Sequence, residues 1–261
     1  MNAAAYLDRI GYRGGTAPTA ETLTSLHRAH MLSVPFENLD IPLGRTIELA
    51  LERFFDKIVA RRRGGFCYEL NGLFGWLLAE LGFPVVSLSA RVFNGENIGP
   101  DFDHMLLLVK LEQRYVADVG FGDSFLEPLP MDGEDHVEGD RTYRLVESER
   151  ALTLERLEPG ADWEPQYAFT GAPRRLEDFA AMCHHQQTSP QSPFTKKTVC
   201  SLPTADGRVT LSNGRLIVTT HGRRGERPVA SHDEYRELLR RQFGIELDAG
   251  AAIERLMDRG D

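Results

Sequence analysis

The chain carries Arg63-Gly64-Gly65-Phe66-Cys67-Tyr68-Glu69-Leu70-Asn71 about a quarter of the way along its 261 residues. The two glycines allow a tight backbone turn. A helix is predicted directly after that turn, because one buried stripe is formed by Leu70, Phe74, Leu77 and Leu81. Cys67 is therefore expected in the first helical turn, where free N–H groups and the helix dipole lower a thiol pKa and can also stabilise an oxyanion. The stretch predicts a reactive thiol.

A buried structural cysteine is the alternative interpretation of Cys67, since free cysteine is among the most buried residue types. The glycine turn and the helix start favour the reactive thiol instead. Cys183 and Cys200 have no such surroundings and are predicted to be packing residues. Three widely spaced cysteines without a CxxC pair are typical of reduced thiols in a reducing compartment.

Composition excludes several classes of protein. The hydrophobic content of 41% is enough for a substantial core, and no apolar run approaches the roughly 20 residues of a membrane helix. The first residues lack the order of a signal peptide, so a cytoplasmic location is expected. A net charge of −9 argues against nucleic acid or an anionic membrane as the main partner. We interpret three groups of basic residues as solvated surface: Arg61-Arg62-Arg63, Lys196-Lys197 and Arg223-Arg224.

The order of elements indicates an α+β fold. Helices are expected in the first third, and Asn2 and Thr19 are the predicted N-caps of the first two. A further helical pattern runs from Leu51 to Val59, and the Cys67 helix should end at Gly82. Strands are expected at residues 85–92, 105–111, 115–119, 142–146 and 151–157. The last third should hold a helix after Pro173, a hairpin turning at residues 212–215, a capping box of Ser231 with Glu234, and a last helix with Ile253, Leu256 and Met257. No phosphate-binding glycine loop is present.

A thiol nucleophile needs a histidine to share its proton and a third group to orient that histidine. Of eight histidines, His104 is the candidate, because it stands at the entry to an apolar strand. Asp118 interrupts the next strand and needs a partner there. If the hairpin loop covers residues 111–113, position 118 pairs with 106 and His104 becomes its diagonal neighbour on one face. A shift of one residue would separate them, so this register is permitted by the sequence and not established by it.

Three other segments are weaker candidates for a functional site. Gly120-Phe121-Gly122-Asp123 can border a cleft, because glycines admit a ligand and Phe121 offers a flat wall, although such a segment is commonly a turn. Cys183-His184-His185 points its side chains in different directions on a helix, so no metal site is expected. His27 and His30 lie on an ordinary amphipathic helix and are interpreted as structural or solvated.

Several of these motifs, in this order, closely resemble the arylamine N-acetyltransferase family, including bacterial members that also O-acetylate N-hydroxyarylamines. The resemblance covers most of the chain. The motifs that carry it are residues 63–71, Asp103-His104-Met105, residues 116–122, Pro35-Phe36-Glu37-Asn38-Leu39, Ser89-Ala90-Arg91-Val92 and Ser192-Pro193-Phe194-Thr195. It implies a helical bundle over residues 1–84, a β-barrel over 85–188 and an α/β lid over 189–261.

The resemblance also implies roles for individual residues. Cys67 would be the acetyl-accepting nucleophile, His104 its proton partner and Asp118 the residue that orients the histidine. Acetyl-coenzyme A would be the acetyl donor, with no metal. The residues expected near bound ligands are Phe36, Phe121, Gly122 and Phe194. The implied reaction is ping-pong transfer to arylamines, arylhydrazines or the oxygen of N-hydroxyarylamines.

Other activities remain compatible with the same residues. A related amide synthase would act on a carrier-bound acyl chain, and a thiol hydrolase or transglutaminase-like enzyme would pass the acyl group to water or a protein amine. A binding module without turnover is disfavoured by an intact Cys, His and Asp set. The physiological acceptor, the acyl-chain preference, the residues that hold the coenzyme phosphates and the oligomeric state are left open by the sequence.

Overall fold

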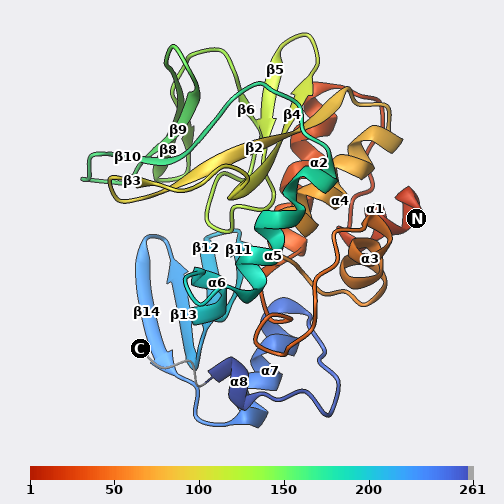
Figure 1. Ribbon diagram of the computed structural model, residues 1–261, viewed down its shortest axis with the longest axis vertical. Coiled ribbons are helices and arrows are strands. Elements are labelled where there is room, and N and C mark those ends of the chain that lie inside the picture. Colours follow the sequence, from red (N-terminus) through yellow and green to blue (C-terminus); the bar gives the residue numbers. More distant parts are fainter. Residues whose placement is uncertain (258–261) are drawn as a thin grey trace.

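The computed structural model describes residues 1–257. Its first third is helical, as predicted (Figure 1), and consists of α1 (Ala3–Arg9), α2 (Ala20–Ser33), α3 (Leu51–Phe55), the π-helical turn η1 (Asp56–Ala60) and α4 (Cys67–Glu80). Asn2 and Thr19 accept hydrogen bonds from the backbone N–H groups of Ala5 and Thr22, so both predicted N-caps are confirmed. Helix α4 begins at Cys67, as the glycine turn indicated.

The middle of the chain forms a large antiparallel sheet that curls into a nearly closed barrel (Figure 1). Its strands are β2 (Val85–Asn94), β3 (Asn97–Ile98), β4 (His104–Lys110), β5 (Arg114–Ala117), β6 (Leu129–Pro130), β7 (His136–Glu138), β8 (Arg141–Glu147), β9 (Leu152–Leu157) and β10 (Trp163–Phe169). The strand order is β6-β5-β4-β2-β10-β9-β8-β7, with β3 paired to β2. This confirms the α+β class with a central barrel.

The register of the β4–β5 hairpin is the one predicted from the sequence. Leu107 pairs with Ala117 and Leu108 with Val116, with residues 111–113 as the loop. Continued by one residue, this register sets position 118 opposite position 106, as predicted. His104 and Asp118 therefore project from the same face of neighbouring strands.

A second sheet occupies the lower part of Figure 1 together with α7 and α8. Its order is β1-β11-β12-β13-β14, with bounds β1 (Phe36–Glu37), β11 (Val199–Thr204), β12 (Gly207–Ser212), β13 (Arg215–Thr220) and β14 (Arg223–Pro228). Strand β1 comes from the first third of the chain and pairs with β11, so the helical region is hydrogen-bonded to this sheet. The predicted hairpin turns at Asn213-Gly214, where Asn213 adopts a φ of 48°.

The remaining helices connect or cover the two sheets. They are η2 (Leu176–Phe179), α5 (Ala180–Thr188), α6 (Pro193–Lys196), α7 (His232–Phe243) and α8 (Glu254–Met257). Ser231 caps α7, but the carboxylate of Glu234 accepts from the N–H of Ala230 and not from that of Ser231. The expected capping box is therefore only half formed.

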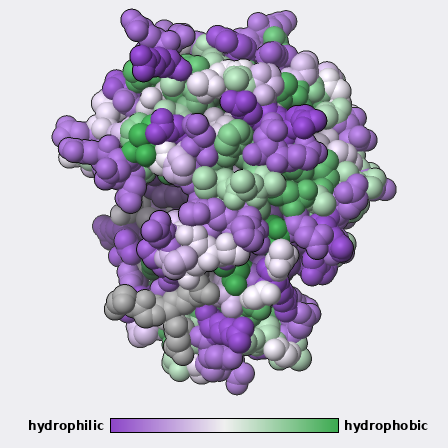
Figure 2. All heavy atoms as spheres, viewed as in Figure 1, coloured by the Kyte–Doolittle hydropathy of each residue, from purple (hydrophilic) through white to green (hydrophobic). Residues whose placement is uncertain are grey.

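The buried apolar residues form separate clusters under the helices, inside the barrel and between the second sheet and α7. Hydrophilic side chains cover most of the face in Figure 2. The exposed large hydrophobic residues of the described chain are Met1, Ile98, Val137, Val146 and Val218. They are separated from one another along the sequence.

Candidate active site

Cys67 lies at the start of α4, buried against the segment that follows β5. A methyl group on Gly120 would come within 2.8 Å of the Cys67 Cα and 2.6 Å of Asn71 Nδ2. Only glycine fits between these atoms without a shift of the backbone. The segment after β5 therefore packs directly on the first turn of α4.

Gly120→Ala should lower both the stability and the activity of the protein. The added methyl group must push α4 and the segment after β5 apart, so we expect a loss of about 1–3 kcal/mol in the free energy of unfolding. Urea denaturation measures this loss. Gly171→Ala is the control, because a methyl group there meets nothing within 4 Å and the φ of Gly171 is ordinary. Equal stability of both variants would contradict the close packing.

The pKa of the Cys67 thiol is raised, and not lowered as its place at the helix start predicted. Burial raises this pKa well above its usual value, because removal from water disfavours the charged thiolate. The backbone N–H of Met105 opposes the effect without cancelling it. A thiolate at Cys67 therefore needs a proton acceptor or a positive charge beside it, and the helix dipole alone is insufficient.

His104 and Asp118 form a buried hydrogen bond. The Nε2–H of His104 donates to Oδ2 of Asp118 over 2.7 Å, and both side chains are almost fully excluded from water. Burial acts to raise the pKa of Asp118, but the charge and hydrogen bond of His104, with further hydrogen bonds from Asn71 and Gly120, hold it below its usual value. Asp118 is thus an ionised carboxylate that is hydrogen-bonded to the imidazole.

Asn71 joins the thiol helix to the other two residues, a role that the sequence analysis missed. Its Nδ2 donates to Oδ1 of Asp118 over 2.8 Å and to the carbonyl of Met105 over 2.6 Å, while its Oδ1 accepts from the N–H of Val119 over 2.9 Å. Residue 71 lies one helical turn after Cys67 and on the same face. That spacing was the available signal, but it does not reveal what the face contacts.

Aromatic side chains surround His104. The ring centroids of Phe121 and Tyr167 each lie 5.2 Å from that of the imidazole. Gly122, with a φ of 93°, lies against the ring of Phe36, and the ring of Phe36 is 6.2 Å from that of Phe194. The structure thus places Phe121 against His104 and brings Phe36, Gly122 and Phe194 together.

Arg63 is not the surface residue that the sequence suggested. It is buried, and its guanidinium contacts Oε1 of Glu37 at 2.7 Å and Oδ1 of Asp40 at 3.1 Å. The ammonium of Lys57 lies 2.8 Å from Oδ2 of Asp40 and 2.9 Å from Oε1 of Glu69. These five residues form a buried ion cluster, and Glu69 also accepts from the N–H of Phe66 directly before Cys67.

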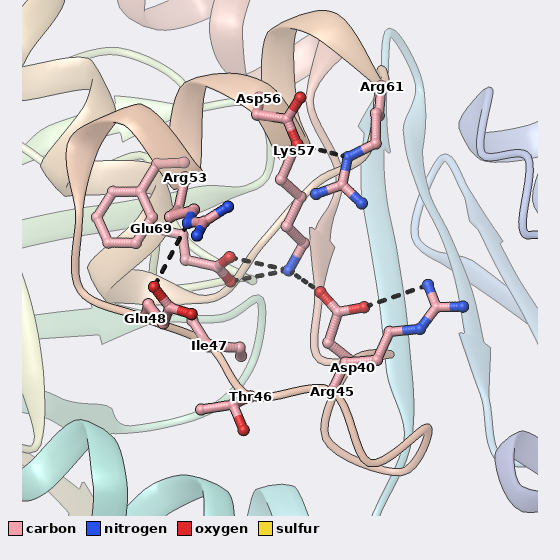
Figure 3. Close-up of a pocket in the computed structure, with 11 residues that line it drawn as sticks. Asp40, Arg45, Thr46, Ile47, Glu48, Arg53, Asp56, Lys57, Arg61 and Glu69 are labelled. Carbon is pink, nitrogen blue, oxygen red and sulfur yellow. Dashed lines mark hydrogen bonds and ion pairs between the residues drawn. The ribbon is translucent and has the colours of Figure 1, made fainter.

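The ion cluster reaches the floor of a cavity of about 240 Å³ (Figure 3). Figure 3 shows the Lys57 ammonium between the carboxylates of Asp40 and Glu69. Burial opposes ionisation of Asp40, but Lys57 and Arg63 lower its pKa to about 2. Burial also opposes the charge on Lys57, yet the surrounding carboxylates raise its pKa above the usual value. Through Glu69, the cluster is hydrogen-bonded to the backbone directly before Cys67.

The other cysteines, Cys183 and Cys200, are free and buried, as predicted for packing residues. Within residues 1–257, no group of three or more His, Cys, Asp or Glu side chains is arranged to hold a metal ion. Over the same residues, every helix is too short or too polar to span a bilayer.

The sequence matches the model of a family described as N-acetyltransferase over residues 19–252. It is 36% identical to the arylamine N-acetyltransferase pineal gland isozyme NAT-3 of Gallus gallus and 34% identical to arylamine N-acetyltransferase 1 of Homo sapiens, with 95% of both chains covered in each pair. The structure is similar to arylamine N-acetyltransferase of Mycobacterium marinum, with a TM-score of 0.91 and 31% identity over 99% of both chains. A complex of the Mycobacterium marinum enzyme with CoA gives a TM-score of 0.89 and 31% identity, over 99% of this chain and 98% of that one.

Proposed function

This chain belongs to the arylamine N-acetyltransferase family, and from that premise we propose that Cys67 carries the acetyl group between acetyl-CoA and the acceptor. The single observation that supports this role best is the buried 2.7 Å hydrogen bond between His104 and Asp118. It is connected to the helix of Cys67 through Asn71. We propose the three residues Cys67, His104 and Asp118 as the catalytic set.

In the first half-reaction, the sulfur of Cys67 attacks the thioester carbonyl of acetyl-CoA. His104 accepts the thiol proton on Nδ1, because its Nε2–H is engaged with Asp118. The tetrahedral intermediate collapses, the C–S bond to coenzyme A breaks, and His104 returns the proton to the leaving thiolate. Burial of Cys67 raises its thiol pKa, so transfer of the proton to His104 is the step that makes sulfur nucleophilic.

In the second half-reaction, the acceptor nitrogen attacks the acetyl-Cys67 carbonyl and His104 takes the proton that it loses. The Cys67 thiolate leaves and recovers a proton from His104, so the enzyme returns to its starting state. The same steps transfer the acetyl group to the oxygen of an N-hydroxyarylamine. General base catalysis of this kind contributes about 10²–10⁴-fold.

We further propose that the aromatic residues near His104 receive the ligands. Phe121 supplies a flat wall beside the imidazole, and Gly122 brings backbone close to Phe36. Phe194 extends this surface through its contact with Phe36. An aromatic acceptor is suited to such rings, because ring stacking adds about 0.5–1.5 kcal/mol beyond the burial of area. The domains proposed around this site are the bundle (1–84), the barrel (85–188) and the lid (189–261).

Intact-mass spectrometry after mixing with acetyl-CoA tests the proposal. One acetyl group should appear on the protein, map to the peptide that contains Cys67, and remain in a variant with Cys183→Ser and Cys200→Ser. An aniline-type acceptor should then discharge it. No adduct, or an adduct on another residue, would contradict the proposal. Rapid discharge by water would favour a hydrolase, and acylation only by a carrier-bound chain would favour an amide synthase.

A further inference from the structure

His27, which the sequence analysis interpreted as structural or solvated, contacts the backbone of Asp118. It projects from α2 and is completely buried. Its Nε2 lies 3.1 Å from the backbone N of Asp118, and its Nδ1 lies 2.7 Å from the carbonyl oxygen of Leu126. The imidazole stacks on Phe125 with ring planes 18° apart and meets Phe74 edge to face. The ring is therefore held on all sides.

These two partners assign the protonation state of His27. A backbone carbonyl only accepts and a backbone N–H only donates, so Nδ1 carries the proton and Nε2 presents its lone pair to Asp118. The ring must be neutral to do this. Burial lowers the pKa of His27 to about 4, which agrees with a neutral ring near pH 7. The titratable groups that face it are the carboxylate of Asp118 and the neighbouring imidazole of His30.

We propose that His27 is a positioning residue for acetyl transfer. It accepts a hydrogen bond from the backbone N–H of Asp118 and so fixes the position at which the Asp118 carboxylate meets His104. The inference rests on the proposed catalytic set. Asn71, Gly120 and His104 hold the carboxylate oxygens of Asp118, whereas His27 holds its backbone.

The backbone at Asp118 needs such an anchor because the paired part of β5 ends at Ala117. Beyond that residue the chain leaves the sheet and runs through Phe121 and Gly122 towards Leu126. His27 binds both ends of this excursion, through the N–H of Asp118 and the carbonyl of Leu126. One rigid ring on α2 thereby sets the span of the segment that carries the carboxylate and the aromatic wall.

Two amide substitutions separate the two contacts. The side-chain amide of Asn reaches the position of the imidazole Nδ1, so His27→Asn can still donate to Leu126 but leaves the Asp118 N–H without an acceptor. The longer side chain of Gln reaches the position of Nε2, so His27→Gln supplies an oxygen for that N–H. The matched control is His30→Asn, since His30 is also buried on α2 but bonds to the hydroxyl of Tyr6 and not to Asp118.

The readouts are the single-turnover rate of Cys67 acetylation and the pH midpoint of Cys67 alkylation by iodoacetamide. We expect His27→Asn to slow acetylation by about 10–100-fold, the range that a small misplacement of a catalytic group produces. Its alkylation midpoint should move to higher pH, because a displaced Asp118 stabilises the His104 imidazolium less. His27→Gln should restore most of the rate, and His30→Asn should leave the midpoint unchanged.

A wild-type rate and midpoint in His27→Asn would overturn the inference, as would an equal shift in His30→Asn. If His27→Asn does not fold, His27→Leu replaces it, because leucine keeps an apolar side chain between Phe74 and Phe125 and removes both hydrogen bonds. A wild-type rate in His27→Leu would likewise overturn the inference. Failure of the proposed function is distinguishable, because wild-type protein would then form no acetyl-Cys67 at all.

Discussion

Replacing Asp118 with Asn is expected to slow acetylation of Cys67 by about 10³–10⁴-fold, although the side chain keeps its shape. Oδ1 of Asp118 accepts from Asn71 Nδ2 and from the N–H of Gly120. The Asn carbonyl oxygen must take that position, because an amide nitrogen there would face two donors. The amide NH₂ group is then turned towards Nε2 of His104.

This geometry forces His104 into the wrong tautomer. With a donor facing it, Nε2 must carry the lone pair, and the proton moves to Nδ1, the atom that is proposed to accept the proton of Cys67. The negative charge that stabilises an imidazolium is also lost. Because burial already raises the pKa of the thiol, loss of the base leaves Cys67 protonated.

Rapid quenching followed by intact-mass spectrometry measures this rate. A matched control is Asp132→Asn, because Asp132 forms a comparable hydrogen bond of 3.0 Å with His136, the first residue of β7. Unlike the His104–Asp118 bond, this one is partly exposed to water. That variant should acetylate within about twofold of wild type, as expected for an exposed pair. A rate for Asp118→Asn within tenfold of wild type would remove Asp118 from the catalytic set.

The pairing of His104 with Asp118 was predictable from sequence because both lie on one hairpin with a short loop. Once the loop is placed at residues 111–113, alternation along the strands decides which side chains share a face. His27 and Asn71 were not predictable in the same way. Their contacts depend on how α2 and α4 pack on the sheet, and neither helix pattern contains that information.

Two features of the structure differ from what the local sequence pattern predicts, the pKa of Cys67 and strand β14. The helix start predicted a low pKa at Cys67, but the thiol is buried, and burial raises its pKa. Strand β14 was missed for the opposite reason, since all of its residues are exposed and it shows no apolar alternation. The burial of Cys67 and the pairing of β14 with β13 both depend on contacts with other segments, which the local pattern does not contain.

Arg63 illustrates the same limit. Three consecutive arginines are typical of a solvent-exposed segment. Arg62, however, adopts a φ of 53°, and the chain turns there so that Arg63 enters the ion cluster. Arg61 remains outside, half exposed, in an ion pair with Asp56. Adjacent residues of the same type therefore have very different electrostatic surroundings, and their substitutions should differ accordingly.

Arg63→Met is expected to lower the free energy of unfolding by about 3–5 kcal/mol, because it removes the guanidinium from two buried carboxylates. Glu37 is then balanced by Lys57 alone, and Asp40 by Lys57 and the more distant Arg45. Arg61→Met, the control, removes an ion pair in water and should cost about 0–1 kcal/mol. Urea denaturation of both variants at pH 7 measures the difference. Similar losses in the two variants would show that the buried cluster contributes no more than the surface pair.

The pH dependence of the stability difference between wild type and Arg63→Met shows whether the difference is electrostatic. In the wild type, the pKa of Asp40 is lowered from 3.8 to about 2, so its carboxylate stabilises the native state above pH 3.8 and this contribution is lost as the pH falls towards 2. Removing Arg63 raises that native pKa. The stability gap between wild type and Arg63→Met should therefore be largest above about pH 4 and shrink below it. A gap that stays constant down to pH 3 would mean that Arg63 acts through the packing of its methylene groups and not through its charge.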